Sequence, residues 1–164
     1  MLNSVQTYFI KKNLKPSKSP MTGDRMSMVG VLFNADVSDR NQLREHIEHN
    51  FDEDSSKLIF LGFSRKNYEK EKKSNFIFTK KDFSLLGQPR SEVITEFLKH
   101  NYKLLFNFFG ENEHYLENIA QLAQANLKVG LCESSEKIND LLLDLESKDL
   151  RFFEESSKYI KHII

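Results

Sequence analysis

The most constraining feature of this sequence is a nearly unbroken apolar run, Tyr102–Phe109, which is followed by a helical pattern and then by a second apolar run, Leu127–Cys132. Such runs without polar alternation are typical of strands covered on both faces, as in parallel sheets. Between the runs, apolar residues recur at helical spacing, Glu117 and Gln121 lie on the opposite helical face, and Asn126 can end the helix. The apolar residues are Leu116, Ile119, Ala120, Leu122 and Ala123. The stretch therefore predicts a strand, a crossover helix and a parallel strand.

The rest of the chain repeats this alternation of apolar runs and helical patterns. Further strands are predicted at residues 27–33, 57–63 and 140–145, with a short strand or edge segment at 76–78. Helices are predicted after the N-caps Ser38 or Asp39 and Ser91, and over residues 150–164. The pattern indicates an α/β fold with a single open, mostly parallel sheet of about five strands and helices on both faces, Rossmann-like or flavodoxin-like in type.

The first 27 residues differ from the remainder. Apolar residues recur there at roughly helical spacing, lysines follow, and proline and serine then break the pattern between Pro16 and Gly23. We predict an N-terminal amphipathic helix and flexible linker over residues 1–27 and a single α/β domain over residues 28–164. Such a helix either packs on or frays from its own domain, or attaches to a membrane surface.

Composition excludes several classes of protein. The 164 residues hold one cysteine, so no internal disulfide can form. We find neither a signal-peptide pattern at the start nor an apolar stretch long enough for a transmembrane segment, and therefore expect a cytoplasmic protein. The formal net charge is zero, which argues against general nucleic-acid binding. The basic, aromatic stretch Arg65–Lys81 is either a solvated loop or a segment that binds single-stranded nucleic acid by charge and base stacking.

Candidate binding residues follow from the predicted sheet, because ligands of open α/β sheets bind outside the carboxyl ends of the strands. The side chains at those ends are Asn34, Asp36, Ser64, Arg65, Asn107 and Cys132. The loop after the first strand lacks glycine and carries two acids, which disfavours a phosphate site, and the chain has no P-loop motif. We therefore expect no cofactor.

Catalytic and metal-binding patterns are also missing from the sequence. His46 and His49 share a helical turn, but no further spaced ligand accompanies them, so we expect no metal site. Cys132 precedes Glu133, and an acid opposes the thiolate that a nucleophile needs. The prediction is a non-catalytic binding or protein-interaction module with a protein partner or a second copy of the chain. The alternative is an enzyme that recognises a small molecule or nucleotide at the strand ends.

Several short motifs carry a family resemblance. They are Phe97-Leu98 followed by Tyr102–Leu105, Leu127–Leu131, Asn139-Asp140-Leu141, and Phe152–Glu155 with Lys158–Ile160. With them the chain after Met28 resembles an uncharacterised bacterial family of short α/β proteins, a domain of unknown function. The resemblance implies a fold and transfers no catalytic residue.

Overall fold

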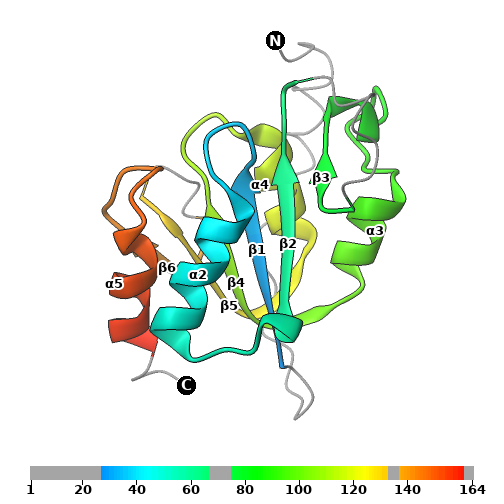
Figure 1. The fold of residues 1–164 in the computed structure, drawn as a ribbon. Helices are drawn as coiled ribbons and strands as arrows, with labels where there is room; N and C mark the ends of the chain where they lie inside the picture. The colour runs from blue at the N-terminus through cyan, green and yellow to red at the C-terminus, as the bar shows by residue number, and fades with distance from the viewer. Residues whose placement is uncertain (1–26, 67–74, 133–136, 161–164) are drawn as a thin grey trace.

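A computed structural model describes residues 27–66, 75–132 and 137–160 (Figure 1). The predicted N-terminal helix and linker lie outside these residues, apart from Ser27. The strands are β1 Met28–Asn34, β2 Leu58–Phe63, β3 Ile77–Phe78, β4 Asn101–Phe108, β5 Gln124–Leu131 and β6 Leu141–Leu143. The α-helices are α2 Arg40–Phe51, α3 Glu92–Leu98, α4 His114–Leu122 and α5 Arg151–Ile160, and two short 3₁₀ helices span Ser55–Lys57 and Lys80–Asp82.

The strands form one open, fully parallel sheet in the order β3-β2-β1-β4-β5-β6. The predicted α/β class is thereby confirmed, with six strands where the sequence indicated about five. The sixth strand is the edge strand β3, which has two residues and lies in the stretch 76–78 that the sequence indicated as a short strand or edge segment. Such short strands leave little apolar pattern in a sequence.

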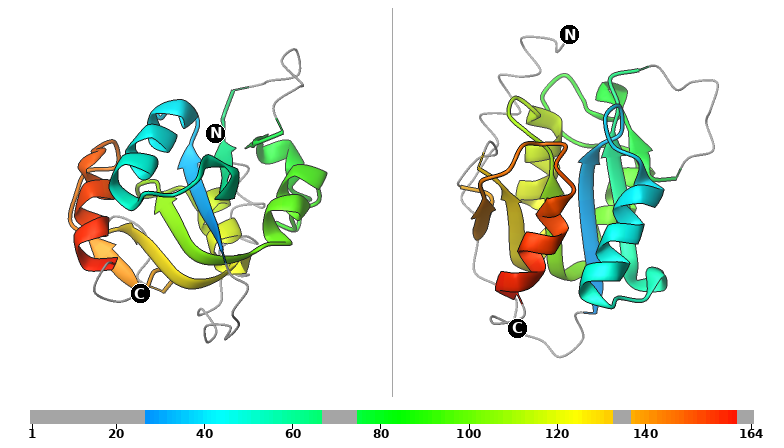
Figure 2. Two further views of the ribbon diagram at one scale, coloured as in Figure 1. Left: turned by 60° about the horizontal axis from the view of Figure 1, so that its bottom comes forward. Right: turned by 60° about the vertical axis from the view of Figure 1, so that its left-hand side comes forward.

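Helices cover both faces of the sheet and enclose two separate cores (Figure 2). Helices α2 and α5 contact each other and pack on one face, where Phe106 of β4 meets Phe152 and Phe153. Helices α3 and α4 pack on the other face with Leu105 of β4 and Tyr102 beside them. Because β4 is covered on both sides, its sequence is almost continuously apolar.

Helix termini follow ordinary capping chemistry. The Asp39 side chain accepts a hydrogen bond from the Gln42 amide at the start of α2, and the Ser91 side chain accepts one from the Ile94 amide at the start of α3. Asp52 ends α2 in the left-handed conformation with φ 51°. The two helix starts thus lie where the sequence indicated.

The predicted crossover helix was partly wrong. Asn126 does not end it, because α4 stops at Leu122 and β5 already begins at Gln124. Leu122, expected on the apolar face, is 45% exposed, whereas Glu117, expected on the opposite face, is 8% exposed. Helical spacing alone does not specify where a helix stops or what covers its outer face.

The strand order reverses between β1 and β4. The chain leaves β1 toward α2 on one face of the sheet and leaves β4 toward α4 on the other face (Figure 1). Two loops that diverge in this way leave a crevice outside the carboxyl ends of the two strands. The fold therefore places the candidate site at this switch point.

Candidate functional site

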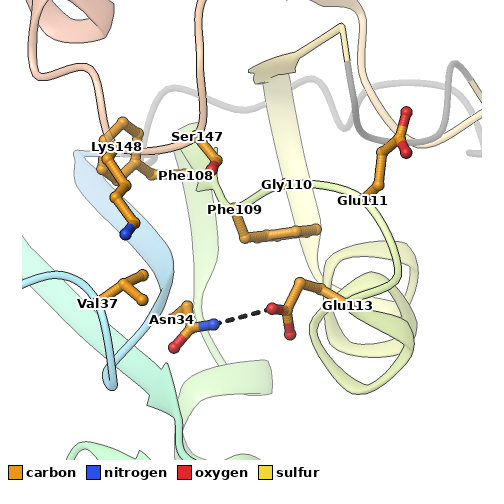
Figure 3. Close-up of a pocket in the computed structure, with 9 residues that line it drawn as sticks. All are labelled: Asn34, Val37, Phe108, Phe109, Gly110, Glu111, Glu113, Ser147 and Lys148. Carbon is orange, nitrogen blue, oxygen red and sulfur yellow. Dashed lines mark hydrogen bonds between the residues drawn. The ribbon is translucent and has the colours of Figure 1, made fainter.

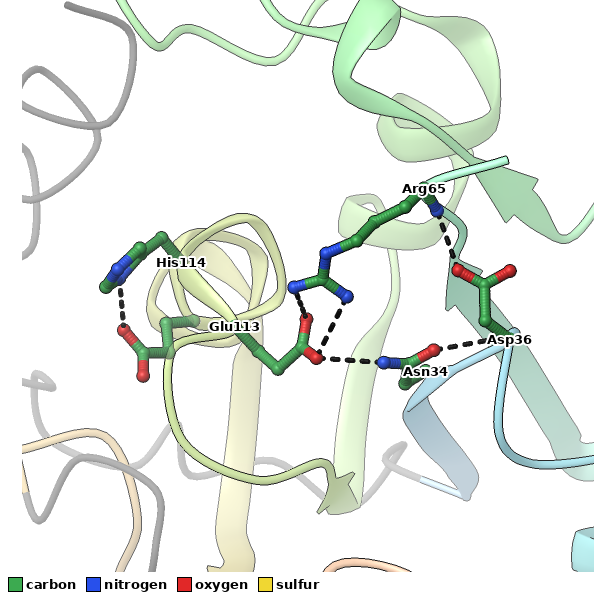
Figure 4. Close-up of polar contacts among 6 residues, drawn as sticks. Asn34, Asp36, Arg65, Glu113 and His114 are labelled. Carbon is green, nitrogen blue, oxygen red and sulfur yellow. Dashed lines mark hydrogen bonds and ion pairs between the residues drawn. The ribbon is translucent and has the colours of Figure 1, made fainter. Parts of the chain in front are cut away.

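Four of the predicted site residues, Asn34, Asp36, Ser64 and Arg65, lie together at the carboxyl edge of β1 and β2. Figure 4 shows Asn34, Asp36 and Arg65. Asn34 and Phe63 are register partners, so the residues that follow the two strands emerge at the same level. One Asp36 carboxylate oxygen accepts the Ser64 hydroxyl at 2.6 Å, and the other accepts the Arg65 amide at 2.8 Å. This pairing fixes the β1–α2 loop to the end of β2.

Glu113, which the sequence argument missed, completes the group. It immediately precedes α4. The Arg65 guanidinium donates to both of its carboxylate oxygens, from Nη1 to Oε1 at 3.2 Å and from Nη2 to Oε2 at 3.1 Å. The Asn34 amide donates to the same carboxylate at 2.8 Å. The one available signal was an acid just before a predicted helix, which the helix dipole favours but which is common in proteins. We name Asn34, Asp36, Ser64, Arg65 and Glu113 the edge network.

The other two predicted site residues lie elsewhere. Asn107 is fully buried, and its register partner is Leu32, which lies two residues before Asn34 on β1. Its side-chain amide donates to Asn139 Oδ1 at 2.7 Å. Cys132 is exposed after β5, and β4 separates that strand from β1. Two strand spacings amount to roughly 10 Å. The structure therefore does not bring either side chain into the edge network.

A cavity of about 320 Å³ adjoins the edge network (Figure 3). Its walls come from the loops after β1 and β4 and from the segment between β6 and α5. The lining residues are Asn34, Val37, Phe108, Phe109, Gly110, Glu111, Glu113, Ser147 and Lys148. We name this space the switch-point cavity, because it lies where the strand order reverses.

The backbone of the β1–α2 loop is not free to hold phosphate. The Ala35 amide donates to Phe63 O, and the Val37 and Ser38 amides donate to Asn34 O. The Asp36 amide donates to the Asn34 side chain at 2.9 Å. In a dinucleotide site these amides point at the pyrophosphate instead. This loop therefore lacks both the glycines and the free donors of a phosphate site.

Burial and charge act together on Tyr115, which lies below the edge network. Its ring stacks on Phe63 with centroids 5.0 Å apart. Burial raises the pKa of the Tyr115 hydroxyl, and the positive charge of Arg65 lowers it in part. Tyr115 therefore stays neutral at physiological pH, and its partner Phe63 has the Arg65 guanidinium 5.5 Å from its ring centroid.

Two other kinds of site were sought in the described part of the chain. Residues 27–66, 75–132 and 137–160 contain no group of three or more histidine, cysteine, aspartate or glutamate side chains placed to hold a metal ion. Within the same ranges, no helix has the length and apolar character needed to cross a membrane.

Comparison with known proteins gave one match. A family model described as a family of unknown function (DUF6913) matches residues 3–163. No curated protein and no solved structure matches the chain.

Proposed function

The chain belongs to this family of unknown function, and we propose that it is a non-catalytic binding module that holds a small polar molecule in the switch-point cavity. The observation that carries the proposal is the position of the cavity. It lies at the reversal of strand order, where open α/β sheets bind their ligands, and the edge network holds one of its walls in place.

The edge network gives that wall a defined geometry. Asn34 both donates to Glu113 and accepts from the Asp36 amide, so its side-chain orientation is set by two hydrogen bonds. Glu113 is 8% exposed and bound by Arg65 at both oxygens. Polar groups that are held in this way are ready to orient a ligand without further ordering.

The chemistry of the lining supports binding over catalysis. Its nine residues include neither histidine nor cysteine, and Ser147 supplies their one hydroxyl group. Both carboxylate oxygens of Glu113 are already hydrogen-bonded within the protein, to Arg65 and Asn34. A nucleophile with an adjacent base is therefore not assembled within this lining.

The proposal has three finer parts. The strand order β3-β2-β1-β4-β5-β6 supports a Rossmann-like classification, since doubly wound dinucleotide-binding sheets have this order. The cytoplasmic location and the bacterial origin expected from the sequence belong to the same proposal. Microscopy of the tagged chain in its native cell tests the location.

Native mass spectrometry of the freshly purified chain, recorded beside a denaturing spectrum, tests the binding function. We expect an extra mass that is lost on denaturation. The variant Val37→Phe should remove it, because Val37 is 47% exposed and a larger ring there fills the cavity without disturbing the core. Leu85→Phe is the matched control, since Leu85 is also exposed and lies outside the cavity lining.

Two outcomes would reject the proposal. One is an apo mass in both spectra together with no thermal stabilisation by any member of a metabolite panel. The other is a bound mass that survives in Val37→Phe, because the ligand would then occupy a different place.

A further inference from the structure

Three charged side chains line the switch-point cavity: the cation Lys148 and the carboxylates Glu111 and Glu113. Lys148 comes from the segment between β6 and α5, and Glu113 comes from the start of α4. The close-up shows the Lys148 amino group extending toward Val37, while the Glu113 carboxylate points toward Asn34 (Figure 3). A ligand in the cavity therefore meets a cation on one side and a carboxylate on the other.

Lys148 is available to a ligand. Its side chain is exposed at the rim, and no described residue forms a hydrogen bond or ion pair with its ammonium group. Arg151, a cation close to it in sequence, is already paired with Asp149 at 2.6 Å. Lys148 is thus a free cation within the cavity lining, suited to a carboxylate.

Glu113 retains capacity for one more hydrogen bond. A carboxylate offers about four acceptor positions. Oε1 accepts from Asn34 and from Arg65, and Oε2 accepts from Arg65. The remaining position on Oε2 suits a donor such as an amino or hydroxyl group.

Size restricts the ligand further. A cavity of about 320 Å³ is at the lower end of the range for ligand pockets. The amides of the adjoining β1–α2 loop are occupied by protein acceptors, so phosphate finds no backbone donors there. These observations argue against a nucleotide as the ligand and favour a smaller molecule without phosphate groups.

On the premise of the proposed function, we infer that the ligand is a small carboxylic acid that also carries a hydrogen-bond donor, an amino or hydroxy acid. Its carboxylate pairs with Lys148, and its amino or hydroxyl group donates to Glu113. Phe108 and Phe109 provide the apolar wall for its carbon skeleton.

Isothermal titration of the full chain with matched compounds tests this inference. The probes are the common amino acids and short hydroxy acids, each beside the amine and the unsubstituted acid of the same skeleton. We expect the bifunctional acids to bind and both analogues to bind at least about tenfold more weakly, as for loss of one charged hydrogen bond. Lys148→Met should lower the affinity for the bifunctional acid by about tenfold and leave the affinity for the amine unchanged.

Two further variants complete the design. Glu113→Gln preserves the shape of the side chain. It should lower the affinity for the bifunctional acid and leave the affinity for the unsubstituted acid unchanged. Lys158→Met is the control for net charge, because Lys158 lies on α5 and outside the cavity lining. Thermal unfolding confirms that each variant is folded.

The results separate this inference from the proposed function. If inorganic phosphate, a nucleotide or a neutral molecule binds, and Val37→Phe blocks it while Lys148→Met does not, the inference is overturned and the binding function stands. If no probe binds and native mass spectra show only apo chain, both are rejected.

Discussion

Two polar groups lie on the same sheet and differ in their surroundings. The edge network, at the carboxyl ends of β1 and β2, borders a cavity. The second group, which we name the inner cluster, extends from buried positions of β4 and β5 to the segment before β6. Its members are Asn107, Lys128, Asn139 and Asp140.

Hydrogen bonding distinguishes the two groups. In the edge network both Asp36 and Glu113 accept at each of their carboxylate oxygens. In the inner cluster, the buried Asn107 Oδ1 has no hydrogen-bond partner among the described residues. Lys128 is 3% exposed, and its amino group donates to Ala120 O at 2.8 Å. A buried polar group costs stability unless it is paired.

The comparison teaches that polar residues on neighbouring strands serve different purposes. Asn107 on β4 and Lys128 on β5, two members of the inner cluster, are buried where water does not readily replace a lost partner. The edge network adjoins a space that water can enter. Breaking one of its hydrogen bonds therefore costs less stability, and its polar groups are more accessible to a ligand. Substitutions should therefore affect folding at the inner cluster and binding at the edge network.

The largest expected effect is at Gly130 of β5. A Cβ at this position would lie 2.3 Å from Asn139 Nδ2, and Asn107 holds that amide in place. We expect Gly130→Ala to lower the free energy of unfolding by about 3 kcal/mol, through overpacking. Urea denaturation measures the change.

A second substitution identifies the cause. Asn139→Ala removes the clashing amide, so the double variant should lose less stability than the sum of the two single variants. If the two losses in free energy of unfolding are strictly additive, the clash with Asn139 is not the cause of the destabilisation by Gly130→Ala.

An intermediate effect is expected when the two asparagines are compared. Asn107→Ala should cost about 2 kcal/mol, because it removes the bond to Asn139 that is made by a fully buried side chain. Asn34→Ala should cost about 1 kcal/mol, since water from the adjoining cavity can replace the lost amide. Equal losses in urea denaturation would refute the distinction between the two groups.

The smallest expected effect is a pH dependence that belongs to the inner cluster. Burial lowers the pKa of Lys128 from its ordinary 10.5, and the charge of Asp140 opposes this in part. Between the lowered pKa and 10.5, the unfolded chain binds more protons than the folded one. The free energy of unfolding should therefore rise with pH through that window.

Lys128→Met should abolish this rise, as measured by urea denaturation at a series of alkaline pH values. Burial raises the pKa of Tyr102 above its ordinary 10.0, so stability should fall as pH exceeds that value in both proteins. This fall is the internal control. A rise of equal slope in the variant would assign the pH dependence to another group.

Much of the fold was readable in the sequence. Apolar runs predicted the long strands, and capping residues marked the starts of α2 and α3, because both signals are local. The end of α4 was misplaced at Asn126, since nothing local distinguishes the last turn of that helix from the start of β5.

The candidate site was predictable in part. Asn34 ends β1, Asp36 follows it, and Ser64 and Arg65 follow β2, so a local argument placed each of them at the carboxyl end of a strand. That β1 and β2 are neighbours in the sheet was not readable locally. Asn107 was expected there as well, but the register sets it opposite Leu32, inside the sheet. A shift of two residues along a strand moves a side chain by roughly 7 Å.

The sequence by itself determined the α/β class and which strand ends carry polar side chains, because strand and helix periodicity depend on neighbouring residues. Only the tertiary structure decided the strand order, the pairing of Arg65 with Glu113 and the position of Lys148 at the cavity. These features join residues far apart in the chain, and long-range contacts depend on how whole elements pack rather than on any local pattern.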